Sequence, residues 1–220
     1  MCFSATANFT GSAVLGAIGV ATIAEVKHRR ELLFASLPCL FALHQFTEGF
    51  VWLGINGKIS QTALHGVAAA YVLYAQGLLP FLLPLSVLLI EPTRRQRRRM
   101  MGFLILGSAL TLFILWGLMV DPLQVYAHGH SIVYDNPLTT NKPVAVLYVI
   151  TTCGALFFSG FKDLVILGWL NMVGLIIVML IMSYAFTSVW CAYAAIVSVV
   201  IYFFFRRSRG VRPVKYVFAV

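Results

Sequence analysis

Charged residues are scarce in this sequence of 220 residues, because Asp, Glu, Lys and Arg together make up only 10% of it. Soluble domains carry about 25%. Acidic residues are the rarest, with 7 Asp and Glu against 16 Lys and Arg. The longest polar stretch lies between Asp121 and Pro143 and is too short to form a soluble domain. A hydrophobic content of 60% therefore indicates a polytopic membrane protein.

Three further absences exclude particular chemistries. The four cysteines form no CxxC pair and no His/Cys cluster at zinc-finger spacing, although a disulfide between Cys2 and Cys191 stays open. No Lys or Arg precedes the first apolar run, so we expect no cleaved signal peptide. The last apolar segment, residues 187–205, contains no lysine, which excludes a retinal Schiff base there.

Long apolar segments make up most of the chain. At about twenty residues per span, they predict an all-α integral membrane protein with a single domain, residues 1–220, and seven transmembrane helices. The expected spans are residues 9–26, 32–54, 63–90, 101–120, 144–160, 164–183 and 187–205. Pro80 and Pro84 interrupt the hydrogen-bond ladder of the third span, so we expect a kink there.

The basic residues fall mainly on one side of these spans. The other side holds only Lys58 and Lys142. By the positive-inside rule, the N-terminus is expected outside and the C-terminus in the cytoplasm, with the protein in an inner (cytoplasmic) membrane. Because the charge is spread over short loops, nucleic acid is excluded as a partner. The 14 residues on the basic side are Lys27, Arg29, Arg30, Arg94, Arg95, Arg97, Arg98, Arg99, Lys162, Arg206, Arg207, Arg209, Arg212 and Lys215.

One loop on the basic side contains five arginines close together. Such a cluster fixes the topology of the neighbouring spans, and it could also hold anionic lipid headgroups. The sequence leaves both interpretations open. The residues are Arg94, Arg95, Arg97, Arg98 and Arg99.

The second span carries the most informative residues of the chain. Helical spacing places His44, Glu48 and Trp52 on one face, with Gln45 beside them. Glu48 is the only carboxylate well inside a predicted span, and an ionisable group there usually faces the protein interior, a partner or a water-filled cavity. Gly49 should let another helix approach Glu48 closely. We therefore expect a polar intramembrane cavity around Glu48.

Other polar residues could extend this cavity. The N-terminal segment is expected on the same side as Glu48, and it could fold back so that Cys2 or Ser4 meets that carboxylate. Gln76 and Asn171, inside other spans, could continue a polar path inward. The long outer loop between Asp121 and Pro143 is expected to form a lid or a solvated loop.

A metal site is a second interpretation of the same residues. Its candidate ligands are His44, Glu48, His65, His128 and His130, but their spacing shows no third ligand that would converge with His44 and Glu48. The sequence assigns no cofactor. Haem stays open because His44 could be an axial ligand, although no second histidine lies at a matching depth.

Two stretches carry a resemblance that covers most of the chain. The opening residues 1–9, MCFSATA followed by Asn8 and Phe9, and the pattern from Gln45 to Trp52, QxxEGxxW, resemble a family of bacterial multi-pass membrane proteins known only as a domain of unknown function. That resemblance implies no activity.

Two other membrane families share only part of the pattern. The seven-helix hydrolases that include alkaline ceramidases and adiponectin receptors are similar in helix number, but they use an HxxxH pair near the last helix, and no histidine follows His130 here. The helix layout resembles that of transporters built from duplicated three-helix units, but the proline-glutamine pair of the PQ-loop and sugar-efflux families is absent.

Three functional classes remain open. The first is a protein that binds or transports a small molecule or ion in a cavity lined by His44, Gln45, Glu48 and Trp52. The second is a membrane-embedded enzyme, metal-dependent or not, that uses His44 and Glu48. The third is a receptor or an assembly protein in which the polar residues serve packing. We rank binding or transport first, with the lipid bilayer, anionic lipid and a small ligand as the expected partners.

Overall fold

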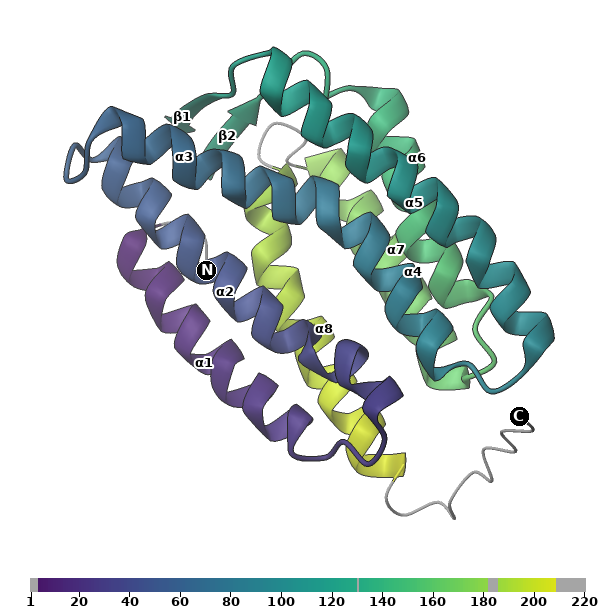
Figure 1. The fold of residues 1–220 in the computed structure, drawn as a ribbon. Helices are drawn as coiled ribbons and strands as arrows, with labels where there is room; N and C mark the ends of the chain where they lie inside the picture. Colours follow the sequence, from purple (N-terminus) through teal and green to yellow (C-terminus); the bar gives the residue numbers. More distant parts are fainter. Residues whose placement is uncertain (1–3, 130, 182–185, 209–220) are drawn as a thin grey trace.

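The computed structural model describes residues 4–129, 131–181 and 186–208, and it is 80% helical. Within these residues the chain forms seven long helices that run back and forth beside one another (Figure 1). The helices are α1 Ala5–Ile23, α2 Leu32–Ile55, the continuous run of α3 Gln61–Val72, η2 Leu73–Leu78 and α4 Leu79–Ile90, then α5 Arg94–Val120, α6 Lys142–Phe157, α7 Lys162–Ile181 and α8 Phe186–Ser208. A short 3₁₀ helix, η1 Arg29–Glu31, precedes α2.

Each predicted helical segment has a counterpart, but two expectations were wrong. The fourth helix begins at Arg94 instead of residue 101, because the hydroxyl of Thr93 accepts the Gln96 N–H at 3.3 Å and caps the helix. The chain is also not all-α. Strands β1 Gln124–His128 and β2 Ser131–Asp135 pair antiparallel in the loop that follows α5. Gly129, with φ +61°, supplies the left-handed backbone of their turn.

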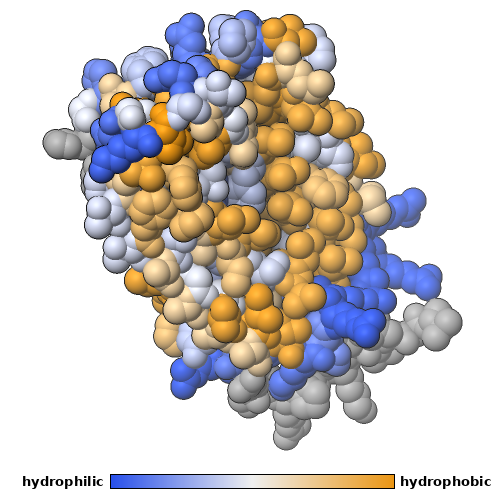
Figure 2. Space-filling model, turned by 60° about the vertical axis from the view of Figure 1, so that its left-hand side comes forward, coloured by the Kyte–Doolittle hydropathy of each residue, from blue (hydrophilic) through white to orange (hydrophobic). Residues whose placement is uncertain are grey.

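The surface is largely apolar. Three helical segments among the described residues are long and apolar enough to cross a membrane, namely Ala5–Ile23, Gln61–Ile90 and Arg94–Val120. Large apolar side chains such as Leu112 and Met119 are exposed on α5. Figure 2 shows one face of the molecule, on which a broad hydrophobic band separates two hydrophilic ends. This surface is compatible with a membrane location.

Charge is segregated between the two ends of the molecule. Because the helices alternate in direction, the turns after α1, α4 and α6 and the end of α8 lie at one end, which we call the basic end (Figure 1). The α2–α3 turn and the β-hairpin lie at the other, the hairpin end. Lys58 and Lys142 are near the hairpin end. The exposed residues at the basic end are Lys27, Arg29, Arg30, Arg94, Arg95, Arg98, Arg99, Lys162, Arg206 and Arg207.

Close contact between α1 and α2 depends on small residues. A Cβ added at Gly19 would lie 2.7 Å from the backbone nitrogen of Cys39, so the two helices can approach this closely only with glycine at that position. About two turns before Gly19 on α1, the hydroxyl of Ser12 donates to the carbonyl oxygen of Ala42 on α2 at 2.8 Å. These contacts hold α1 along the length of α2.

The third helix widens into a π turn over Leu73–Leu78, immediately before Pro80. Proline lacks an N–H, and its ring clashes with the carbonyl four residues earlier, so the ladder is interrupted here as expected. Thr111 of α5 donates its hydroxyl to the carbonyl of Gly77 at 2.7 Å. Gly107 of α5 packs directly against the Pro80 carbonyl. Pro84 interrupts the ladder a second time, because it has no N–H to donate to the Pro80 carbonyl, although the chain keeps its helical course through α4.

Candidate functional site

The predicted face of α2 is buried. His44, Gln45, Glu48 and Trp52 have exposed fractions of 6%, 1%, 0% and 7%. Three of these side chains are polar, and they lie inside an otherwise apolar group of helices. A buried carboxylate and a buried imidazole are costly to place there unless neighbouring groups or a ligand compensate. This stretch is therefore the centre of the candidate site.

Asn8 of α1 joins this row, and the sequence analysis did not select it. Its side chain is fully buried, and its Oδ1 accepts a hydrogen bond from Nε2 of Gln45 at 2.5 Å. The Nδ2 of Asn8 donates in turn to the carbonyl of Ser4 at 3.2 Å. The hydroxyl of Ser4 accepts the Ala7 N–H at 3.2 Å and caps α1. Ser4 thus contributes through its backbone, while Cys2 lies outside the described residues.

His44 lies within a stack of aromatic rings. Its imidazole is parallel to the Tyr71 ring, with centroids 3.9 Å apart, and its distance from the Tyr74 ring is 4.8 Å. Tyr71 also stacks on Tyr134 of β2 at 4.6 Å. In the part of the chain that the structure describes, neither ring nitrogen of His44 has a hydrogen-bond partner. The stack links the polar row of α2 to the β-hairpin.

The β-hairpin covers the end of α2 and α3. Ile132 and Tyr134 are buried against a cluster that includes Trp52 and Leu64. The outer loop, expected to form a lid or a solvated loop, is thus a β-hairpin with a buried second strand. Trp52 lies in this apolar cluster, so packing accounts for its position.

Gly49 admits a close neighbour, as predicted. A Cβ at Gly49 would lie 2.6 Å from Cε1 of Phe9 on α1. The Phe9 ring also makes edge contacts with Phe46 and Phe50, at 5.3 and 5.5 Å between centroids. The aromatic side chain of α1 therefore packs against position 49, the residue after Glu48, because glycine has no side chain there.

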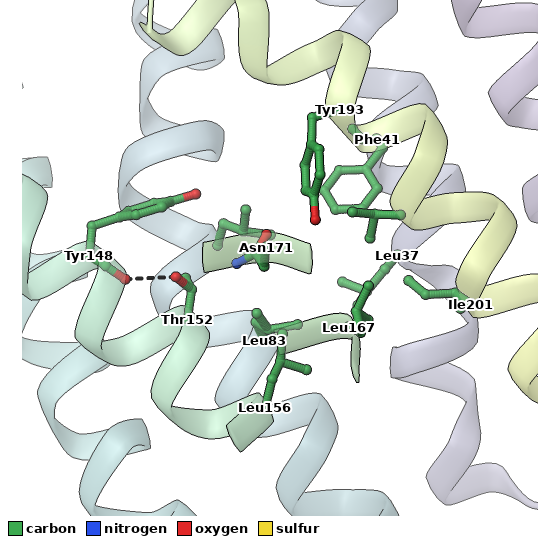
Figure 3. A pocket seen from close by; sticks show the side chains of 13 residues that line it. Leu37, Phe41, Leu83, Tyr148, Thr152, Leu156, Leu167, Asn171, Tyr193 and Ile201 are labelled. Carbon is green, nitrogen blue, oxygen red and sulfur yellow. Dashed lines mark hydrogen bonds between the residues drawn. The ribbon is translucent and has the colours of Figure 1, made fainter. Parts of the chain in front are cut away.

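The two residues predicted to extend a polar path lie in different places. Gln76 is half-buried in the π turn. Asn171 is buried on α7, where its Nδ2 donates to Sγ of Cys153 at 3.2 Å. Asn171 lines a cavity of about 30 Å³ between α2, α4, α6, α7 and α8, and Gln76 is not among the lining residues (Figure 3).

This central cavity also contains polar residues that the sequence analysis did not select. They are Tyr148, Thr152 and Tyr193. On α2 the lining residues are Phe41 and Leu37, which lie about one and two turns before His44 on the same face. One face of α2 therefore contributes to both the central cavity and the polar row.

The candidate metal ligands do not meet among the described residues. His65 on α3 and His128 on β1 are exposed, whereas His44 and Glu48 are buried. His130 lies outside the described residues. No group of three or more His, Cys, Asp and Glu side chains suited to a metal ion occurs in the described part of the chain.

A second buried carboxylate, Glu91, was also not selected from the sequence. It is 0% exposed and lies where α4 ends. Its Oε1 accepts the N–H of Gly160 at 2.9 Å and the hydroxyl of Ser159, while its backbone carbonyl accepts Nε of Arg97 at 2.8 Å. Glu91 thus ties the α4–α5 turn to the α6–α7 turn.

The five arginines that follow α4 differ in their exposure and contacts. Arg97 is half-buried and bound to Glu91, so it belongs to this turn structure. The other four are exposed and available to solvent or lipid, namely Arg94, Arg95, Arg98 and Arg99.

Comparison with known proteins gives a family but no activity. The model of one protein family, described as a family of unknown function, matches residues 1–215. No curated protein and no solved structure matches the chain.

Proposed function

Because the chain belongs to DUF6629, a family of unknown function, we propose its function from the geometry of its own residues. The protein is an integral protein of the bacterial inner membrane with seven spans, its hairpin end outside and its basic end in the cytoplasm. The hydrophobic band between two hydrophilic ends supports this placement (Figure 2). The gathering of exposed basic residues at one end supports the orientation.

The function that this geometry favours is binding and transport of a small solute. The observation that carries the proposal is the continuity along one face of α2. His44, Gln45 and Glu48 form a buried polar row towards the hairpin end, and Leu37 and Phe41 line the central cavity that follows. Polar groups at successive depths provide a solute with a sequence of sites across the membrane.

A membrane-embedded enzyme is the second candidate, and one observation favours it. Both ring nitrogens of His44 are buried with no hydrogen-bond partner in the described residues, so the imidazole could serve as a base or a ligand. Against it, the polar groups are distributed along α2 and in the central cavity and do not converge on one reacting position. Transport therefore accounts for more of the polar residues.

Native mass spectrometry of the gently solubilised protein, with metal analysis of the same sample, tests the proposal. We expect the wild type to retain a small molecule that is lost in a His44→Ala, Glu48→Gln double variant. Glu31→Gln, which alters a half-buried acid at the basic end, is the control and should retain it. A stoichiometric metal lost in the double variant would favour the enzyme. An empty wild type would favour a receptor or assembly protein with structural polar residues.

Labelling of single cysteines tests the orientation. In a background without the native cysteines, Asn56→Cys at the hairpin end and His28→Cys at the basic end place a thiol at exposed positions. A membrane-impermeant maleimide added to intact spheroplasts should label position 56 and spare position 28 until the membrane is permeabilised. The reverse pattern would invert the proposed topology.

A further inference from the structure

The central cavity has a lining without charge. Figure 3 draws the 13 residues that form it, and none is an Asp, Glu, Lys, Arg or His. Most are aliphatic, such as Leu83, Leu167 and Ile201. An ion placed there would lose its hydration and meet no opposite charge, at an energetic cost that strongly disfavours binding. The lining therefore favours uncharged ligands over ions.

The polar groups of the lining come from three helices and meet in one place. The hydroxyls of Tyr148 on α6 and Tyr193 on α8 point towards the Asn171 amide on α7 (Figure 3). Thr152 is already engaged, because its hydroxyl donates to the carbonyl of Tyr148 at 2.8 Å. These groups form a neutral, hydrogen-bonding side in a cavity that is otherwise apolar.

Two of these groups retain hydrogen-bonding capacity. Tyr148 and Asn171 are each only 7% exposed. Asn171 donates its amide nitrogen to Sγ of Cys153 at 3.2 Å, and among the described residues its oxygen accepts no hydrogen bond. The Tyr148 hydroxyl likewise makes none with the described residues. A ligand could accept from the Tyr148 hydroxyl and donate to the Asn171 oxygen at the same time.

The size of the cavity limits the ligand. A space of about 30 Å³ holds one or two waters, so a ligand of a few heavy atoms fills it. We propose that the central cavity binds a short uncharged molecule with one apolar end and one end that both accepts and donates hydrogen bonds, as a primary amide does. This inference rests on the proposed function, because it names the class of solute that is transported.

Three planar probes of equal heavy-atom number test the proposal. Acetamide is neutral with an apolar methyl group, urea is neutral with a second amino group in place of the methyl, and guanidinium carries a positive charge. Entry into proteoliposomes is followed by light scattering as the vesicles swell. We expect the protein to accelerate acetamide most and urea less, and to leave guanidinium at the rate of protein-free vesicles.

Variants of the lining connect the flux to the cavity. Tyr148→Phe removes only a hydroxyl, and Asn171→Leu replaces the amide by an apolar group of similar size. Each should lower the protein-dependent acetamide flux roughly fivefold, since each removes one hydrogen bond to the ligand. Tyr126→Phe, which removes an exposed hydroxyl on β1, is the matched control and should have no effect.

The outcomes separate this inference from the proposed function. Guanidinium flux that Glu48→Gln abolishes would overturn the neutral-solute proposal and leave transport in place. Acetamide flux that neither cavity variant changes would also overturn it, as would the absence of flux for all three probes. The proposed function is tested separately by native mass spectrometry, in which the wild type should retain a small molecule whatever the outcome of the flux experiments.

Discussion

Two carboxylates are completely buried in this protein, Glu48 and Glu91, and their surroundings differ. Glu91 accepts hydrogen bonds from a turn, through the Gly160 N–H and the Ser159 hydroxyl. Glu48 lies in the middle of a helix face, in a row with His44 and Gln45. Bonds to a turn explain a buried acid by structure alone. Glu48 belongs to a row of polar side chains on the face of α2 whose next turns line the central cavity, and this position is the basis of the proposed ligand site.

The largest effect on stability is expected from Glu91→Ala. The variant leaves the Gly160 N–H and the Ser159 hydroxyl without their acceptor, and buried donors left unsatisfied cost about 1–3 kcal/mol each. The free energy of unfolding in detergent measures the loss. Glu31→Ala is the control, because Glu31 also accepts backbone N–H groups, of Lys27 and His28, but its side chain is only half-buried. Equal losses of unfolding free energy in the two variants would show that Glu91 does not stabilise the protein by joining the two turns.

The next effect concerns the packing of α1 against Gly49, the residue after Glu48. Gly49→Leu places a side chain where the Phe9 ring lies, and overpacking of this kind costs about 1–3 kcal/mol. Gly66→Leu is the matched control, because nothing lies within 4 Å of a Cβ at that position. Unfolding of both variants in detergent is compared with the wild type. If Gly49→Leu unfolds like the wild type, the close contact of α1 with position 49 is not needed for the structure of the site.

A double-mutant cycle measures the link between α1 and the polar row. Asn8→Ala, Gln45→Ala and the double variant should give a coupling energy of about 1 kcal/mol for a buried neutral hydrogen bond. The control cycle pairs Asn8 with Thr47, whose hydroxyl donates to the Leu43 carbonyl of its own helix, and its coupling should be near zero. Similar couplings in the two cycles would contradict a specific Asn8–Gln45 bond.

The smallest effect on stability is expected from Glu48→Gln, and it tests the comparison directly. Glutamine keeps the shape and the hydrogen-bonding capacity of the side chain, so the free energy of unfolding should change by less than about 1 kcal/mol. Retention of the small ligand in native mass spectrometry should nevertheless be lost. A stability loss as large as that of Glu91→Ala would make Glu48 a second structural acid.

The positions of the helices could be predicted because hydrophobicity is a local property of the sequence. Residues 63–90 were expected to form one span, and Gln61–Ile90 is one continuous helix run. The arginine stretch from Arg94 was expected to be a loop because of its charge, whereas in the structure the cap at Thr93 begins a helix there. The β-hairpin was not predicted, since its burial depends on contacts of Ile132 and Tyr134 with distant helices.

The candidate site could be predicted only where a single helix determines it. The four-residue spacing of His44, Glu48 and Trp52 was sufficient to find the buried face of α2. Asn8 lies among small residues of α1, and only the packing of α1 on α2 brings it to Gln45. The central cavity combines residues of five helices, such as Leu37 and Tyr193. No local pattern in the sequence shows that they meet.

The π turn between α3 and α4 has a consequence for the register of the chain. A π turn holds one more residue than an α turn, so residues 73–78 contain in effect a single-residue insertion. Deletion of Ala75 would remove this inserted residue and rotate Tyr71 by about 100° relative to α4. The ring would then leave its position between His44 and Tyr134. One inserted residue thus sets the angle at which the third helix presents its aromatic side chain to the second.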